Sequence, residues 1–362
     1  MQSDDIKLVF QELRYLVDKY PENVKFQDAD ILLKPEFLDD SNKILICTQI
    51  GDYLYPSQYE PYLETAKEKN NFYIFLLPHK YDLELEEKYK DVAKFYYIPS
   101  FYSWYTKYVT PKPVIKNIQK HFISLNNRLD YGRLVLFCYF LKSKRLLNQS
   151  HFSYVGEERD KTLDELLANE GLGFYLNRFD KLGDNKFKLK EIKKHIPRYL
   201  PGEDEHTFIP GTWDWSINNA DLYNESLIHI VFETYAGGAG PYPFFTEKIW
   251  KPIAMKQPFI VYGGRNSLKE LQELGFKTFE PVINESYDSA DELLQEVLRE
   301  IKRLGNQSLN NLEHQVTNQL QDILNHNHNH FYNVLPEIYK TTMEKVGKEI
   351  DSLIQHHIQL TK

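Results

Sequence analysis

The chain has 362 residues, of which 42% are hydrophobic, so it is long enough to bury the cores of two domains of ordinary size. Its net charge of −8 argues against a surface built for nucleic-acid backbones, although it leaves room for a local basic groove. The two cysteines, Cys47 and Cys138, lie in apolar runs and are predicted to be buried thiols rather than a disulfide framework.

The sequence shows no segment that is typical of secretion or membrane insertion. The first residues, M-Q-S-D-D, lack the basic and apolar parts of a signal peptide. No apolar run reaches the roughly 18 residues that a membrane-spanning helix needs. We therefore expect a cytoplasmic protein without a transmembrane segment, and the reduced cysteines agree with that compartment.

The first third of the sequence alternates predicted helices and strands. In chain order these are a helix at 4–19, a strand at 43–48, a helix at 60–69, a strand at 72–77, a helix at 83–92 and a strand at 94–98. Such alternation is typical of a doubly wound parallel sheet. Residues 1–115 are thus predicted to form a first Rossmann-like α/β domain, with a hinge at Pro111-Lys112-Pro113 near its end.

A second α/β domain is predicted to begin with a strand at 122–125 and a helix at 134–147. A polar loop between them carries Arg128 and Arg133. Taken alone, either arginine is more often a surface residue than a ligand-binding one. Between residues 150 and 225 the pattern is less regular, with short predicted segments near 152–155, 163–167 and 189–196.

The stretch from Phe232 to Glu280 is the most informative part of the chain. An apolar strand at 227–232 leads into a Gly/Pro-rich loop at 236–243, a helix that opens at Thr246 and a second strand at 258–262. This order predicts a βαβ unit, whose loops gather at the carboxyl ends of the strands. Pro252 falls inside the helical run and is predicted to kink it.

The predicted helix start at Thr246 has features of an anion-binding site. Thr246 is a plausible N-cap, and Glu247 and Lys248 follow in the first turn. The amides of such a turn suit a phosphate, and Lys248 adds a positive charge. The alternative is a solvated helix start, because the loop is neither a G-x-G-x-x-G nor a Walker sequence.

The C-terminal part is predicted to be helical, with an amphipathic helix at 289–304 and one or two long helices between 309 and 358. The repeat N-H-N-H-N-H at 325–330 is predicted to be a solvated loop between helices. A metal site there is disfavoured because the segment supplies no fourth ligand. Trp213-Asp214-Trp215 is either a sugar-stacking platform or a core feature, and its single carboxylate excludes a D-x-D metal motif.

Three segments of the βαβ unit together resemble a known donor-binding motif: F-E-T at 232–234, F-F-T-E-K-I-W-K-P-I-A at 244–254 and P-F-I-V-Y-G at 258–263. The α1,3-fucosyltransferase family has F-E-N, then Y-V-T-E-K, then a strand that ends in glycine. Fucosyltransferase-like proteins of phages and bacteria are similar in sharing T-E-K-x-x-K-P-I, P-F-I and L-G-F-K-T-F. The resemblance covers roughly residues 120–300, and the T-E-K block is its specific part.

The resemblance implies roles for several residues. In the family, a strand is followed by an S-N-P-x-A-P-x-R segment and a helix, and the arginine of that segment binds the donor's diphosphate. Arg133 matches this arginine, and a guanidinium suits the task because it forms forked, charge-assisted bonds with a diphosphate. Glu247 matches a glutamate that bonds donor hydroxyls, and Glu233 matches the glutamate of F-E-N. Thr234 and Phe244 depart from the asparagine and tyrosine of the family, which leaves the identities of the nucleotide and sugar open.

The implied fold is the two-domain GT-B architecture of glycosyltransferases. Residues 1–115 would form the acceptor side, residues 116–304 the donor-binding domain, and residues 305–362 C-terminal helices that pack back on the first domain. Arg133, Lys248 and the helix start at Thr246 would stabilise the leaving diphosphate, so neither a bridging metal nor another cofactor is required. An inverting transfer also needs a general base, for which Asp52 is a weak candidate and His79 a weaker one.

The preferred hypothesis is a glycosyltransferase that moves fucose or a related sugar from a nucleotide-diphosphate donor to a glycan. The resemblance implies a GDP-linked donor, and the nucleotide sugar and the glycan are the expected partners. A phage-type transferase acting on DNA bases is an alternative, against which the acidic composition argues. A non-catalytic glycan-binding protein is another, in which the 14% aromatic residues would form stacking surfaces.

Overall fold

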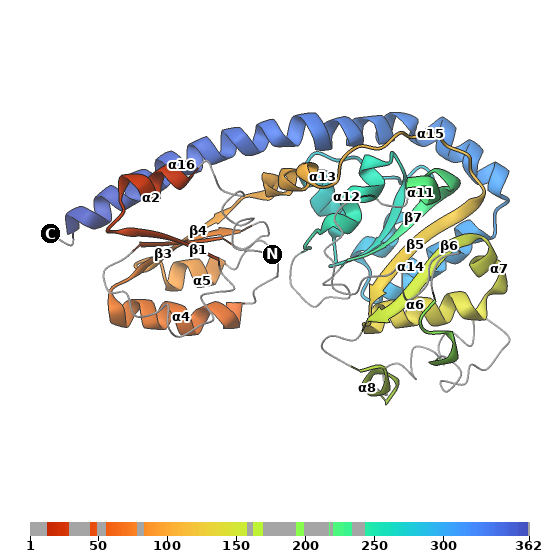
Figure 1. Ribbon diagram of the computed structural model, residues 1–362, viewed down its shortest axis with the longest axis horizontal. Coiled ribbons are helices and arrows are strands. Elements are labelled where there is room, and N and C mark those ends of the chain that lie inside the picture. The colour runs from red at the N-terminus through yellow and green to blue at the C-terminus, as the bar shows by residue number, and fades with distance from the viewer. Residues whose placement is uncertain are drawn as a thin grey trace. The chain divides into compact units, whose positions relative to one another are not determined.

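The computed structural model describes residues 13–28, 44–48, 56–77, 83–157, 162–168, 193–198, 217, 220–233 and 243–360. The chain divides into two compact units, unit 1 with residues 1–106 and 331–362 and unit 2 with residues 107–330. The sequence-based division fell after residues 115 and 304 instead. Each unit contains a four-stranded parallel sheet with helices, which confirms the predicted α/β class (Figure 1). The GT-B architecture stays a prediction.

The sheet of unit 1 is built from strands in consecutive order, β1-β2-β3-β4. Their bounds are Val24–Asp28, Ile44–Thr48, Phe72–Leu77 and Ala93–Tyr97. The last three confirm the predicted strands, whereas β1 was missed because its sequence, V-K-F-Q-D, is short and half polar. The described strands of this sheet contain no reversal of order, so the doubly wound pattern expected here is not seen among them.

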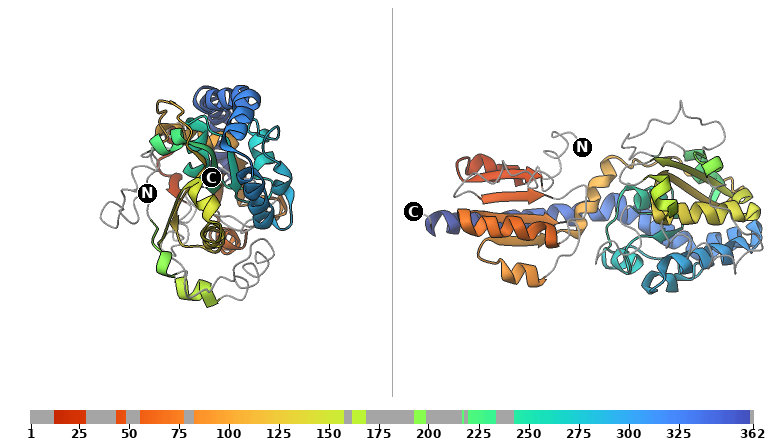
Figure 2. Two further views of the ribbon diagram at one scale, coloured as in Figure 1. Left: turned by 90° about the vertical axis from the view of Figure 1, so that its right-hand side faces the viewer. Right: turned by 90° about the horizontal axis from the view of Figure 1, so that it is seen from below.

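Helices cover both faces of this sheet. Those of unit 1 are α2 (Arg14–Lys19), α4 (Pro56–Lys69), α5 (Leu83–Lys88) and α16 (Leu335–Leu360). Figures 1 and 2 show α4 and α5 on one face, while α2 and α16 lie on the other in Figure 1. The carboxylate of Asp351 on α16 accepts hydrogen bonds from Lys19 Nζ at 2.8 Å and from the hydroxyl of Tyr20 at 2.7 Å, which ties the C-terminal helix to the end of α2.

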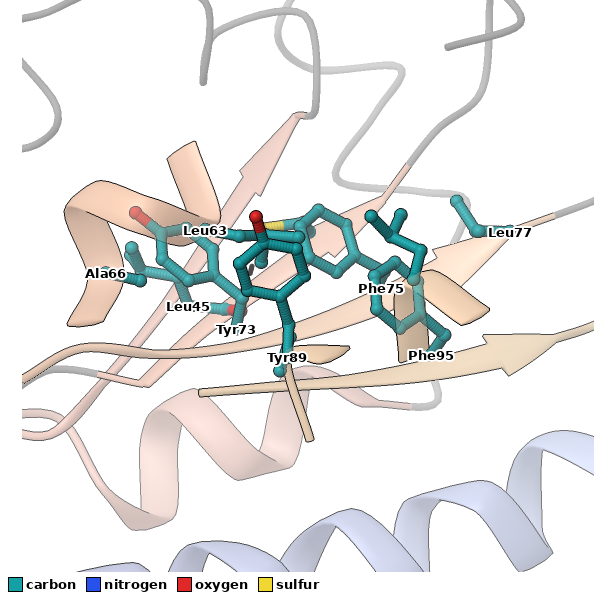
Figure 3. Close-up of a cluster of buried hydrophobic side chains, with 11 residues drawn as sticks. Leu45, Leu63, Ala66, Tyr73, Phe75, Leu77, Tyr89 and Phe95 are labelled. Carbon is teal, nitrogen blue, oxygen red and sulfur yellow. Dashed lines mark hydrogen bonds between the residues drawn. The ribbon is translucent and has the colours of Figure 1, made fainter. Parts of the chain in front are cut away.

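The core of unit 1 lies between the sheet and the helices α4 and α5 (Figure 3). The ring of Phe75 on β3 stacks on Phe95 of β4, with ring centroids 4.8 Å apart. Leu63 and Ala66 of α4 close the cluster from the helix side. Alternate residues of β3 and β4 contribute to this face because side chains of a strand point to opposite sides in turn.

Replacing Phe75 by alanine is expected to destabilise unit 1 by about 3–5 kcal/mol, the usual cost of removing a buried aromatic ring. Urea unfolding of the full chain, followed by circular dichroism, measures the change. Leu83→Ala is the matched control, because Leu83 is 72% exposed and should change the free energy of unfolding little. Equal losses for the two variants would contradict this account of the core.

The sheet of unit 2 has the strand order β6-β5-β7-β8, and all its pairs are parallel. The bounds are β5 Lys120–Arg128, β6 Ser150–Glu157, β7 Ser226–Phe232 and β8 Phe259–Tyr262. The chain passes from β5 outward to β6 and then returns to the other side of β5 to form β7. The order of the strands therefore reverses between β5 and β7, which is the topological switch point where ligands bind in open α/β sheets.

The predicted helices of unit 2 are present with changed bounds. The helix predicted at 134–147 is two helices, because Ser143 ends the first and its hydroxyl accepts the N–H of Leu146 in the second. The α-helices of this unit are α6 (Tyr131–Lys142), α7 (Lys144–Asn148), α8 (Leu163–Ala168), α11 (Ala220–Glu225), α12 (Glu247–Ala254), α13 (Ser267–Glu273), α14 (Leu293–Gly305) and α15 (Leu309–Asn329). Unit 2 also has the short 3-10 segments η4 (Lys193–His195) and η5 (Glu285–Ser289), whereas η3 (Pro99–Lys107) belongs to unit 1 except for its last residue.

The repeat N-H-N-H-N-H is helical, so the predicted loop was wrong. It forms the last turns of α15, and a π-helical turn, η6 (His330–Val334), follows. His330 is four positions after His326, so both rings lie on one face of the helix. Their Nε2 atoms contact the carbonyls of Gly275 at 2.9 Å and Leu274 at 2.7 Å, just after α13. These side-chain bonds hold the segment in a helix.

The thiols of Cys47 and Cys138 are buried and not bonded to each other, as predicted. Within the described ranges, no set of three or more His, Cys, Asp or Glu side chains could hold a metal ion. A search of the same residues finds no helix with the length and apolar character needed to cross a membrane.

Gly275 is expected to tolerate no side chain. Its φ of +94° is strained for other residues, and an added Cβ would lie 2.6 Å from Cε1 of His330. Gly275→Ala should therefore destabilise unit 2 by about 1–3 kcal/mol from backbone strain, with the clash in addition. Thermal and urea unfolding of the single variants and of Gly275→Ala/His330→Ala measure this. The double variant should lose less than the sum of the two singles, and strict additivity would contradict the clash.

Candidate functional site

The candidate site lies at the carboxyl ends of β5 and β7, the adjacent strands of the switch point. Strand β5 leads through Asp130 into α6, and β7 ends at Phe232, with Glu233 directly after it. Asp130 is the N-cap of α6 in an extended conformation, and its carboxylate accepts the N–H of Arg133 at 2.9 Å. The cap fixes the start of α6 and places Arg133 in its first turn.

Arg133 joins the two strand ends. One terminal nitrogen of its guanidinium pairs with the carboxylate of Asp130. The other donates to the backbone carbonyl of Phe232 at 2.6 Å and to that of Glu233 at 3.1 Å. Burial lowers the pKa of Arg133 to about 10, so the side chain stays cationic at neutral pH. Only 3% of the surface of Arg133 is exposed, so its guanidinium binds groups of the protein itself.

Glu233 presents a buried carboxyl to the start of α12. The N–H of Thr246 donates to its Oε1 at 3.3 Å, and the hydroxyl of Thr246 donates to its Oε2 at 2.5 Å. Burial raises the pKa of Glu233, while the charge of Lys248 and the hydrogen bonds from Thr246 act in the opposite direction. Gly263, the residue after β8, lies beside this side chain: a Cβ added there would be 3.6 Å from Cγ of Glu233, which is ordinary van der Waals contact.

Thr246 is the N-cap residue of α12, as predicted, but its hydroxyl does not bond the helix amides. The hydroxyl is engaged by Glu233 and accepts a hydrogen bond from Nζ of Lys248 at 3.1 Å. The same ammonium lies 2.8 Å from Oε1 of Glu247. Burial favours a raised pKa of Glu247, but the charges of Lys248 and Lys251 outweigh it and lower that pKa.

Lys248 carries the charge that reaches the surface. Its side chain is 32% exposed, whereas Arg133, Glu233 and Thr246 are buried. On the opposite side of α12, Ile249, Trp250 and Ile253 are buried and hold the helix against the core. A half-exposed ammonium in the first turn of a helix, at the carboxyl ends of parallel strands, suits an anionic group of a ligand.

The structure brings most of the predicted site residues together. Arg133, Glu233, Thr246, Lys248 and Glu247 form one continuous chain of contacts, although about a hundred residues separate the first from the second. Phe244 is buried two residues before Thr246. Asp52, His79, Thr234, residues 213–215 and the loop 236–242 lie outside the described residues.

Sequence reasoning missed Asp130 and the part taken by backbone carbonyls. Asp130 precedes the first turn of a predicted helix, so capping preference alone could have identified it. No sequence pattern reports that a guanidinium will bind carbonyls. For Arg133 to contact a diphosphate directly, as the resemblance implies, it would have to exchange the bonds to Phe232 and Glu233 for bonds to the ligand.

Comparisons with known proteins leave the family open. No model of a protein family and no curated protein matches the sequence. A crystal structure of a glycosyltransferase from Rickettsia africae ESF-5 is similar with 16% sequence identity, 94% coverage of this chain, 83% coverage of that chain and a TM-score of 0.34. A likeness at this level decides neither fold nor activity, so the function is inferred from the site.

Glu233→Gln is expected to gain stability relative to the parent as pH rises. The raised pKa means that folding favours the protonated carboxyl. That contribution is present below the unfolded pKa of about 4.3 and is lost as pH rises through the folded pKa. Glutamine does not titrate. Urea unfolding at pH values from 4.5 to 8 measures the difference, with Glu280→Gln at an exposed position as control. If the free energy of unfolding of Glu233→Gln relative to the parent does not change with pH, or falls as pH rises, the raised pKa of Glu233 would be contradicted.

Proposed function

We propose that this protein is a glycosyltransferase that moves a sugar from a nucleotide-diphosphate donor to a glycan acceptor. The supporting observation is the reversal of strand order between β5 and β7, with Lys248 and the start of α12 at the carboxyl ends of these strands. Ligands of open α/β sheets bind outside the carboxyl ends of the strands at such a point. Here that position carries a cation on a rigid helix.

The chemistry of glycosyl transfer fits such a site. The anomeric carbon gains positive charge while the bond to the diphosphate breaks, and the leaving diphosphate gains negative charge. A cation and helix amides placed in advance lower the barrier because they need no reorganisation during the reaction. In this proposal Lys248 and the first turn of α12 stabilise the leaving group, and Arg133 holds the strand end from which Glu233 reaches that turn.

The finer assignments come from the resemblance of the T-E-K segment. They are a GDP-linked donor, fucose or a related sugar, inversion at the anomeric carbon, independence from metal ions and a GT-B arrangement with the donor bound by the second domain. Glu247 would bond hydroxyls of the donor sugar. Asp52 is the proposed base on the acceptor side, and it lies outside the described residues.

Lys248→Met is expected to lower the rate of donor turnover by about 10²–10³-fold, as when one preplaced donor to a developing anion is removed. Incubation with a panel of GDP-, UDP- and CDP-sugars and assay of the released nucleoside diphosphate measures turnover, with calorimetry of nucleotide binding beside it. Lys269→Met is the matched control, because Lys269 is an exposed lysine on α13 of the same unit.

Four other outcomes would count against the proposal. Neither binding nor turnover of any nucleotide sugar would exclude the transferase. Turnover that is the same in Lys248→Met and Lys269→Met would exclude this site. Glycan binding without turnover, unaffected by Lys248→Met, would favour a non-catalytic glycan-binding protein, and salt-dependent binding of DNA in a gel shift would favour an acceptor in DNA.

A further inference from the structure

The hydroxyl of Thr246 has an unusual task for a helix N-cap. An N-cap threonine normally accepts an amide N–H of the first turn, and here it does not. It accepts from Nζ of Lys248 at 3.1 Å and lies 2.5 Å from Oε2 of Glu233. Because an ammonium can only donate, the single hydrogen of the hydroxyl is left for Glu233. The direction of both hydrogen bonds is therefore fixed.

The carboxyl at one end of this pair of bonds is held in place. The carbonyls of Phe232 and Glu233 accept hydrogen bonds from Arg133, and Asp130 pairs with the same guanidinium. Gly263 lies against the side chain of Glu233. Glu233 has 1% of its surface exposed, so its carboxyl group is enclosed by protein atoms.

The ammonium at the other end is on a flexible stem. A lysine side chain has four rotatable carbons and loses much conformational freedom when it is placed. Lys248 is partly exposed, and its contacts include the hydroxyl of Thr246 and the carboxylate of Glu247. A cation assists the departure of a diphosphate most when it is already in position before the reaction.

We propose that Thr246 is a positioning residue, whose hydroxyl links the buried carboxyl of Glu233 to the ammonium of Lys248 and so fixes where that ammonium lies. This relay deepens the proposed function and rests on it for the identity of the anion, a nucleoside diphosphate. It assigns to Thr246 an effect on the chemical step through Lys248 and no contact with the reacting atoms. Glu233 and Arg133 support it from inside the protein.

The first test needs no substrate. Acylation of the full chain by a limiting amount of an amine reagent, with quantitation by mass spectrometry, gives the reactivity of Lys248 relative to Lys269. Thr246→Val keeps the shape of the side chain without the hydroxyl and should raise the relative labelling of Lys248 by about threefold or more, since the ammonium loses one of its partners. Thr246→Ser keeps the hydroxyl and should stay within about twofold of the parent.

The second test uses the donor that the parent turns over. Thr246→Val should lower kcat by about 10- to 100-fold and change KM for the nucleotide sugar by less than about threefold, because the interaction lost acts mainly in the transition state. Thr246→Ser should recover most of kcat. A purely structural role would not separate valine from serine in kcat while the two variants unfold at similar urea concentrations.

The results distinguish the failure of the relay from that of the proposed function. Equal labelling of Lys248 in the valine variant, the serine variant and the parent would overturn the relay, whatever the activity. A parent that binds and turns over no nucleotide sugar would overturn the proposed function, while the labelling still decides the relay. If Thr246→Val does not fold, Glu233→Gln replaces it, and unchanged labelling of Lys248 in that variant would again overturn the relay.

Discussion

The hydrogen bonds of one buried guanidinium hold the candidate site together. Arg133 binds the carbonyls of two consecutive residues at the end of β7, and its partner Asp130 is the cap of the helix that follows β5. Two neighbouring strand ends are thereby fixed to each other. This junction sets the position of Glu233. Through Glu233 it also sets the positions of Thr246 and Lys248 at the start of α12. A lysine in place of Arg133 could not bond both carbonyls and the carboxylate in this planar geometry.

Such a junction costs free energy of folding, and in return its hydrogen bonds favour one arrangement of the two strand ends. Moving the guanidinium of Arg133 and the carboxyl group of Glu233 out of water carries a desolvation penalty that paired charges only partly offset. Burial lowers the pKa of Arg133 and raises that of Glu233, and both shifts favour the neutral form of the group, which reflects this penalty. Apolar side chains could fill the same space with equal or greater stability. Retention of charges at a switch point therefore fits a site that uses them. Of the two cations in this chain of contacts, Arg133 is buried and Lys248, with 32% of its side chain exposed, extends its charge partly into solvent.

Local pattern was enough to predict most of the strands and the start of α12, but not the roles of the site residues. Apolar runs identified β7 and β8, and the Thr-Glu-Lys order identified the start of α12, because these follow from burial and capping near each residue. The bonds of Arg133 depend on carbonyls about a hundred residues away, which no local pattern contains. His326 and His330 are a second case in which partners distant in the sequence decide the structure. The repeat that contains them was predicted to be a solvated loop, because the sequence does not show that the carbonyls after α13 are their partners.

The strand orders of the two sheets give each unit a different capacity for binding. Among the described strands of unit 1 the order is consecutive, so neighbouring loops at the carboxyl edge do not diverge to opposite faces of the sheet. In unit 2 the chain leaves β5 in one direction and returns on its other side, which makes the carboxyl ends of β5 and β7 a topological switch point. Arg133, Glu233 and Lys248 lie at that point. Under the proposed function, the anionic group of a donor would bind at this edge of the second sheet.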